Sequence, residues 1–114
     1  MLTTIFVFNS DTPVADPNPL FGIYSAVTRQ RMDHTPKGGW YPKQSVSVEE
    51  AVKAYTIVPA RISGMGDITG SLAAGKLADL VVLDQNIFDI NLDDNPDVQV
   101  SMTVFNGEIV YQKK

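Results

Sequence analysis

Hydrophobic positions in the first third of the chain follow two patterns, one typical of a strand and one of a helix. Apolar residues run without interruption from Ile5 to Phe8, a pattern typical of a parallel strand buried on both faces. The turn formers of residues 9–13 end that run. A helix over residues 18–31 is predicted next, because four apolar residues recur at helical spacing: Leu20, Ile23, Tyr24 and Val27.

A loop and a second helix are expected between residues 32 and 65. Residues 32–44 contain two prolines and two glycines and predict a loop. The motif from Ser47 to Glu50 matches a capping box, so a helix should begin at Val48. Pro59 should end or kink this helix, and a further short helical turn is expected from Ala60 to Met65.

The pattern changes to short strands and glycine turns after Gly64. Two strands are predicted. Residues 78–84 have an uninterrupted apolar centre, and residues 98–105 alternate between apolar and polar positions. Asn106-Gly107 then predicts a type I′ hairpin turn with a return strand over 108–112. We therefore divide the chain into two parts, a strand–helix–helix part over 1–65 and a β part over 66–114.

Composition limits the classes of function that this chain can serve. With 114 residues it is about one domain long, and its net charge of −4 gives no electrostatic footprint for nucleic acid or an anionic membrane. No apolar stretch approaches the length of a transmembrane helix, and no signal peptide precedes the first strand, so we expect a cytoplasmic protein. The absence of cysteine and the single histidine exclude a thiolate nucleophile and a histidine-rich metal centre built from this sequence alone.

One motif resembles a phosphate-binding loop but lacks its context. The segment from Gly70 to Lys76 has the required spacing, yet Leu77 stands where a Ser or Thr would bind Mg²⁺. A strand, not a helix, is predicted directly after Lys76. We therefore interpret this segment as a tight turn that leads into a strand, with Lys76 in solvent.

Four side chains are candidates for chemistry. Asp11 directly follows the predicted buried strand, where carboxylates often bind metals or accept protons, although its position alone favours an Asx turn or a helix cap. His34 lies in a predicted loop, where it is either a ligand or an ordinary surface residue. Trp40 and Tyr41, beside two glycines, could line an apolar substrate pocket or fill a small core.

Nearly the whole chain resembles the C-terminal end of an amidohydrolase-superfamily enzyme, in the branch (amidohydrolase family 3) of N-substituted formamide deformylase-like metal-dependent hydrolases. The stretches that carry this resemblance follow one another in the family's order: Asn9 to Val14, Asn18 to Arg29, Gly39 to Pro42, Ser47 to Thr56, and Gly70 to Asp84.

The resemblance implies a fold and a role for Asp11. The fold would be an α+β fragment, in which residues 1–65 hold the last strand–helix unit of a (β/α)₈ metallo-hydrolase barrel and residues 66–114 the C-terminal strands of a flanking β-sandwich. Asp11 would be the metal-proximal aspartate that shuttles a proton, at a site for Zn or Fe whose histidine ligands would precede Met1.

These implications lead to two hypotheses about function. The chain is either part of a hydrolase of non-peptide C–N bonds, inactive alone and without stoichiometric metal, or a free-standing structural and oligomerisation module. In both cases we expect self-association, because the Ile5–Phe8 strand would lack its neighbours.

Overall fold

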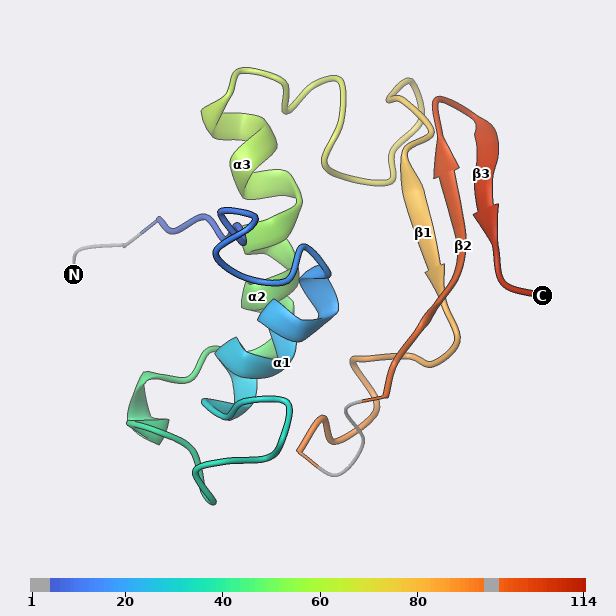
Figure 1. Cartoon of the computed structure of the whole chain (residues 1–114). Coiled ribbons are helices and arrows are strands. Elements are labelled where there is room, and N and C mark those ends of the chain that lie inside the picture. The colour runs from blue at the N-terminus through green and yellow to red at the C-terminus, as the bar shows by residue number, and fades with distance from the viewer. Residues whose placement is uncertain (1–4, 94–96) are drawn as a thin grey trace.

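Helices occupy the first half of the chain and a small antiparallel sheet the second. The computed structural model describes residues 5–93 and 97–114, and Figure 1 shows its elements in sequence order. They are α1 (Pro19–Thr28), the 3₁₀ helix η1 (Pro42–Gln44), α2 (Val48–Tyr55), α3 (Ile57–Ile62), β1 (Leu80–Leu83), β2 (Val100–Phe105) and β3 (Glu108–Gln112). The fold is therefore α+β, as predicted. In the described part of the chain, no helix has the length and apolar character needed to cross a membrane.

Helix α1 is shorter than the sequence predicts. It begins at Pro19, where the Asn18 side chain caps the helix by accepting a 3.0 Å hydrogen bond from the backbone N–H of Leu20. It ends at Thr28 because Arg29 adopts the left-handed conformation (φ 59°), and the Arg29 N–H closes the last turn on the Ser25 carbonyl. The predicted extension to residue 31 was therefore wrong.

Helix α2 begins as predicted with a complete capping box. The Ser47 hydroxyl accepts from the Glu50 N–H at 3.1 Å, and the Glu50 carboxylate accepts from the Ser47 N–H at 2.8 Å. The helix ends at Tyr55 because Thr56 leaves helical geometry. Pro59 does not end it: this proline is the third residue of α3, where a backbone N–H would have no intrahelical partner in any case.

The sheet confirms the three predicted strands, β3 with the predicted bounds and β1 and β2 with narrower ones. Its order is β1-β2-β3, with both pairs antiparallel. Asn106 and Gly107 both have positive φ (50° and 82°), as the predicted type I′ turn requires. The Asp79 carboxylate accepts a 2.7 Å hydrogen bond from the Asn106 N–H, so the residue before β1 holds the hairpin turn in place.

Residues 5–8 do not form the predicted strand. Ile5 is 71% exposed and Val7 39% exposed, and no strand of the described residues lies beside them. The Phe8 N–H instead donates to the carbonyl of Ala54 at 3.1 Å, in the last turn of α2, where helix carbonyls lack intrahelical partners. The expectation of a strand buried on both faces was therefore wrong, because this segment finds no β neighbour in the described chain.

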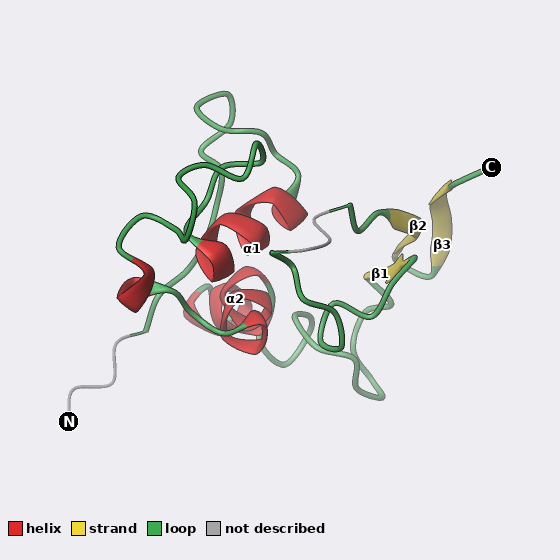
Figure 2. Ribbon diagram, turned by 90° about the horizontal axis from the view of Figure 1, so that it is seen from below, coloured by secondary structure: helices red, strands yellow, loops and turns green. Residues whose placement is uncertain are grey.

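The core lies between α1, α2 and the segment that joins β1 to β2, rather than between α1 and the sheet. Figure 2 shows the helices gathered on one side and the strands on the other. The main buried cluster consists of Ile23, Tyr24, Ala51, Ile87, Leu92 and Val98. Its members come from both halves of the sequence.

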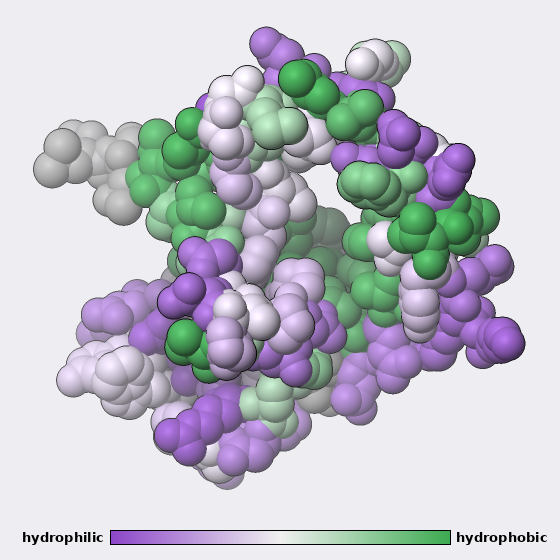
Figure 3. Space-filling model, turned by 45° about the horizontal axis from the view of Figure 1, so that its top comes forward, coloured by the Kyte–Doolittle hydropathy of each residue, from purple (hydrophilic) through white to green (hydrophobic). Residues whose placement is uncertain are grey.

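An apolar cavity separates the helices from the sheet. Its volume is about 520 Å³, and side chains of α1, α2, β1 and β2 line it, Leu20, Tyr55, Leu83 and Phe105 among them. Figure 3 shows hydrophobic side chains around a hollow in this region. The Cα radius of gyration is 15.0 Å, compared with about 13 Å for a compact domain of this length. Helix α1 therefore does not pack directly onto the sheet.

Candidate functional site

Asp11 lies in the exposed loop before α1 with an unpaired carboxylate. Its backbone is left-handed (φ 48°), its N–H donates to the Asn9 side chain at 2.9 Å, and its carbonyl accepts from the Val14 N–H at 2.9 Å. The carboxylate itself makes no hydrogen bond to any described residue. The Asx turn at Asp11 is thus made by Asn9, and the cap of α1 by Asn18, so the Asp11 carboxylate remains available to an outside group.

The described residues do not assemble a metal site around Asp11. Within residues 5–93 and 97–114, no group of three or more His, Cys, Asp or Glu side chains is placed to hold a metal ion. A divalent metal needs several such ligands at once. This chain alone therefore does not fit the metal that its resemblance implies.

His34 contacts α1 through a hydrogen-bonded chain. Its Nδ1 lies 3.1 Å from the Tyr24 hydroxyl, and that hydroxyl donates to Oε1 of Gln30 at 3.0 Å. Because the hydroxyl has only one proton to donate, Nδ1 of His34 must carry the proton and donate to the Tyr24 oxygen. Burial raises the pKa of Tyr24, so its hydroxyl stays protonated and keeps its hydrogen bond to Gln30.

Trp40 and Tyr41 form an exposed aromatic pair beside the end of α1. Their rings meet edge to face at 4.8 Å, and both remain more than half exposed. The Arg29 guanidinium lies over the Trp40 ring at 5.7 Å and donates from Nε to the Trp40 carbonyl at 3.0 Å. Neither aromatic ring fills a core.

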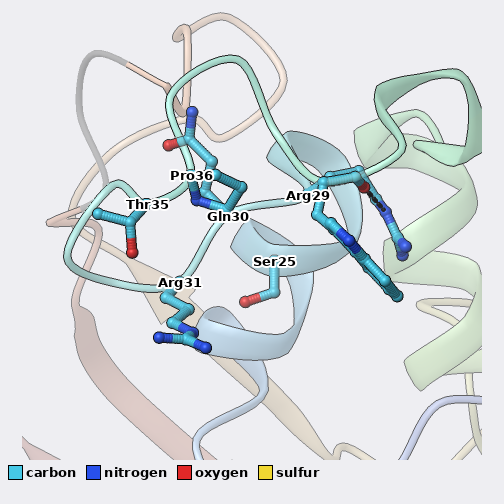
Figure 4. Close-up of a pocket in the computed structure, with 7 residues that line it drawn as sticks. Ser25, Arg29, Gln30, Arg31, Thr35 and Pro36 are labelled. Atoms are coloured by element: carbon cyan, nitrogen blue, oxygen red, sulfur yellow. Dashed lines mark hydrogen bonds between the residues drawn. The ribbon is translucent and has the colours of Figure 1, made fainter.

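A cavity of about 660 Å³ opens beside this pair, and Figure 4 shows the side chains around it. Its lining is Ser25, Arg29, Gln30, Arg31, Thr35, Pro36 and Trp40. Sequence reasoning selected Trp40 but missed both arginines and Ser25. The sequence did contain a signal for the two arginines, because four of the nine Lys and Arg residues of this acidic chain fall between positions 29 and 43.

The structure does not bring all four candidate residues together. Asp11 precedes the N-terminus of α1, whereas His34, Trp40 and Tyr41 belong to the loop after its C-terminus. A ten-residue helix spans about 15 Å. The carboxylate and the aromatic cavity are therefore two separate places on this chain.

Lys76 is held by protein oxygens and does not extend into solvent as expected. Its ammonium group donates to the carbonyls of Gly66 and Thr69 and, at 2.7 Å, to the Ser71 hydroxyl. Strand β1 follows at Leu80, so no helix begins after this loop. Lys76 fixes the turn before the sheet.

The family profile and a curated relative point to the same family. The sequence profile of the Amidohydrolase family matches residues 4–111. The chain is 36% identical over 104 residues to N-substituted formamide deformylase of Arthrobacter pascens, covering 91% of this chain and 19% of that protein. It is 41% identical over 87 residues to Protein LONG AFTER FAR-RED 3 of Arabidopsis thaliana, covering 75% of this chain and 14% of that protein.

A solved structure agrees in fold. The crystal structure of an amidohydrolase from Thermotoga maritima MSB8 aligns with 98% of this chain and 31% of its own, at a TM-score of 0.52 and 23% identity. The chain spans less than a fifth of the length of the two curated relatives above. Because the family profile covers nearly all of the sequence, the chain belongs to the amidohydrolase family.

Proposed function

We propose that this chain forms the C-terminal part of a metal-dependent hydrolase that acts on amide-type carbon–nitrogen bonds other than peptide bonds. The observation that carries the proposal is the family match over residues 4–111, together with a relative named for N-substituted formamide deformylation. That relative is about five times as long as the matched segment, since the chain covers 19% of it. The remaining machinery would lie in the rest of such a polypeptide.

In the complete enzyme, residues 5–8 would be the last strand of the barrel, and residues 66–114 would belong to the flanking β-sandwich. The exposure of Ile5 and Val7 supports this placement, because apolar β-branched side chains in a strand-like run are stabilised by burial between neighbours. The half-open cavity between the helices and the sheet supports it too. Both features leave apolar surface for further elements of the fold to cover.

Asp11 would be this chain's contribution to the metal site of the complete enzyme. It follows the Ile5–Phe8 segment directly, and no described residue occupies its carboxylate. The other ligands for Zn or Fe, histidines above all, would come from outside this sequence. One carboxylate is too few ligands, so the isolated chain should hold no stoichiometric metal and hydrolyse nothing.

The alternative is a free-standing structural or oligomerisation module. One observation favours it: no described side-chain nitrogen or oxygen is both buried and without a hydrogen bond partner. The buried polar side chains of the described residues therefore need no further polypeptide to satisfy them.

The size of the native polypeptide separates the two functions. An antibody raised against the 114-residue chain should detect, in extracts of the source cells, a protein several times larger than 12.5 kDa. Detection of a 12.5 kDa species alone would support the module.

The larger protein then allows a test of Asp11. Asp11→Asn should abolish hydrolysis of an N-substituted formamide and lower the metal content measured by elemental analysis. Asp16→Asn is the matched control, because Asp16 lies in the same exposed loop and its carboxylate only accepts a local hydrogen bond from the Asn18 N–H. Full activity in Asp11→Asn would contradict the assigned role.

A further inference from the structure

The cavity at the C-terminal end of α1 combines a size and a lining that suit a small ligand. Its volume of about 660 Å³ lies within the range of roughly 300–1,000 Å³ typical of ligand sites. Its lining contains two guanidinium side chains, two hydroxyl side chains and one indole ring. This surface lies apart from Asp11, so its role does not depend on the hydrolase proposal.

Arg31 is the cavity cation whose guanidinium has no hydrogen-bond partner among the described residues. In the part of the chain that the structure describes, its guanidinium makes no hydrogen bond and no ion pair. The nearby Asp33 carboxylate accepts through Oδ1 from the Thr35 N–H at 3.0 Å and from the Thr35 hydroxyl at 2.6 Å, and it attracts Arg31 without an ion pair between them. The five N–H groups of the Arg31 guanidinium lie in one plane, and two of them can bind a carboxylate side by side.

A second free donor faces the same space. Figure 4 shows the Ser25 hydroxyl turned toward the side of the cavity where Arg31 lies, with Arg29 on the other side. The Ser25 hydroxyl makes no hydrogen bond to a described residue. An anion bound by Arg31 could therefore accept a further hydrogen bond from Ser25.

Trp40 gives the cavity an apolar wall that contacts with Arg29 hold in place. Arg29 is fixed on the Trp40 ring by stacking and by its Nε hydrogen bond to the Trp40 carbonyl, and 63% of Trp40 remains exposed. Buried Gln30 forms part of the lining and is held by the Tyr24 hydroxyl. A wall that is ordered before a ligand arrives reduces the entropic cost of binding.

We propose that this cavity binds a small aromatic carboxylate. The carboxylate pairs with Arg31 and accepts from Ser25, and the aromatic ring packs against the exposed part of Trp40. Residues 29–43 carry four basic residues and one acidic residue within a chain of net charge −4, so this surface attracts an anion that the rest of the chain repels. The cavity's size favours a small molecule over an acidic protein segment.

Trp40 is the only tryptophan in the sequence, so its indole N–H gives one resolved NMR signal beside the site. The 114-residue chain is titrated with benzoate as the probe and with benzamide as its neutral counterpart. Benzoate should shift the Trp40 signal saturably, and benzamide should bind at least several-fold more weakly, because it lacks the charge that Arg31 recognises.

Two variants remove the same charge from the same loop. Arg31→Gln should weaken benzoate binding by about tenfold or more, because a hydrogen bond to a charged group is lost. Lys37→Gln should change the affinity less than about twofold, because Lys37 does not line the cavity. Ser25→Ala provides an independent variant, with a smaller loss expected. The dispersed amide spectrum of each variant confirms that it is folded.

Four results would overturn the proposal. One is the absence of a saturable benzoate shift. The second is equal binding of benzamide, which would mean that Arg31 does not recognise the carboxylate. The third is equal losses in Arg31→Gln and Lys37→Gln, which would mean general electrostatic attraction without a specific site. The fourth is binding of a short poly-glutamate peptide but not of benzoate, which would assign the surface to an acidic protein segment.

Discussion

The hydroxyl of Tyr24 donates a 3.0 Å hydrogen bond to the side-chain carbonyl of Gln30, and both residues are nearly inaccessible to solvent, at 1% and 6% exposure. This bond joins the middle of α1 to the first residues of the loop that follows it. His34 contacts the same hydroxyl from the exposed side. Together these contacts hold the loop that forms one wall of the cavity beside Trp40.

Tyr24→Phe should lower the free energy of unfolding by about 1–3 kcal/mol, because it leaves a buried Gln30 oxygen without its donor. Urea denaturation measures this difference. Tyr55→Phe is the matched control and should cost less than about 0.5 kcal/mol, because the Tyr55 hydroxyl makes no hydrogen bond to any described residue. Equal losses of unfolding free energy in the two variants would mean that the hydrogen bond from Tyr24 to Gln30 does not stabilise the fold.

Glu50→Gln should remove part of the acid sensitivity of the fold. Hydrogen bonds from the Ser47 N–H and hydroxyl hold the pKa of the Glu50 carboxyl below its ordinary value of 4.5. A lowered folded-state pKa means that the stabilisation is complete above the unfolded-state pKa and is lost as the pH falls through the folded-state pKa. The stability difference between wild type and Glu50→Gln should thus be constant above about pH 5.5 and shrink below pH 4.5.

Denaturation series at several pH values check this prediction. Glu49→Gln is the control, because Glu49 pairs with Lys53 on the exposed face of α2, and such pairs contribute little. A difference for Glu50→Gln that does not change with pH would show that the charge of the capping box is irrelevant.

Local signals predicted the elements that local contacts stabilise. The capping box at Ser47 and the turn at Asn106-Gly107 each depend on residues no more than a few positions apart, so the sequence predicted both. The end of α1 was missed because Arg29, not a glycine, takes the left-handed position. The Ile5–Phe8 strand was wrongly predicted because a strand exists only through its neighbours, which a run of apolar residues does not supply.

The cavity was only partly predictable for a similar reason. Trp40 was noticed as a side chain, but its contact with Arg29 joins residues eleven positions apart across an irregular loop. No periodic pattern encodes such a contact. Counting charges segment by segment would have shown that residues 29–43 are basic, and this count would have pointed to Arg31.

Gly70→Ala should destabilise the chain more than Gly75→Ala. Both glycines have positive φ, 87° and 90°, so each substitution should cost roughly 1–2 kcal/mol of backbone strain. At Gly70 a Cβ would also come within 2.6 Å of the Ala60 Cβ and 3.0 Å of the Ile57 Cα, whereas at Gly75 nothing lies within 4 Å. The loop must then move away from α3, which should add roughly 1–3 kcal/mol. Thermal or urea unfolding of the two variants gives the difference, and similar losses would contradict the close packing of Gly70 on α3.

Val7→Lys should dissociate an assembly that the wild-type chain forms. Residues 5–8 expose apolar side chains, and to other described residues they make a single backbone hydrogen bond, from Phe8 to Ala54, so their remaining backbone groups are available to pair with another chain. A lysine placed in such a contact would bury a charge without a partner, which strongly disfavours association.

Sedimentation equilibrium at micromolar concentrations should therefore show an oligomer for the wild type and a monomer for Val7→Lys. Val14→Lys is the matched control, because Val14 is equally apolar and 79% exposed but lies in the loop beyond this segment. This variant should remain associated. A monomeric wild type would contradict the prediction, and dissociation by both lysines would place the contact elsewhere, since only pairing through residues 5–8 makes the two valines differ.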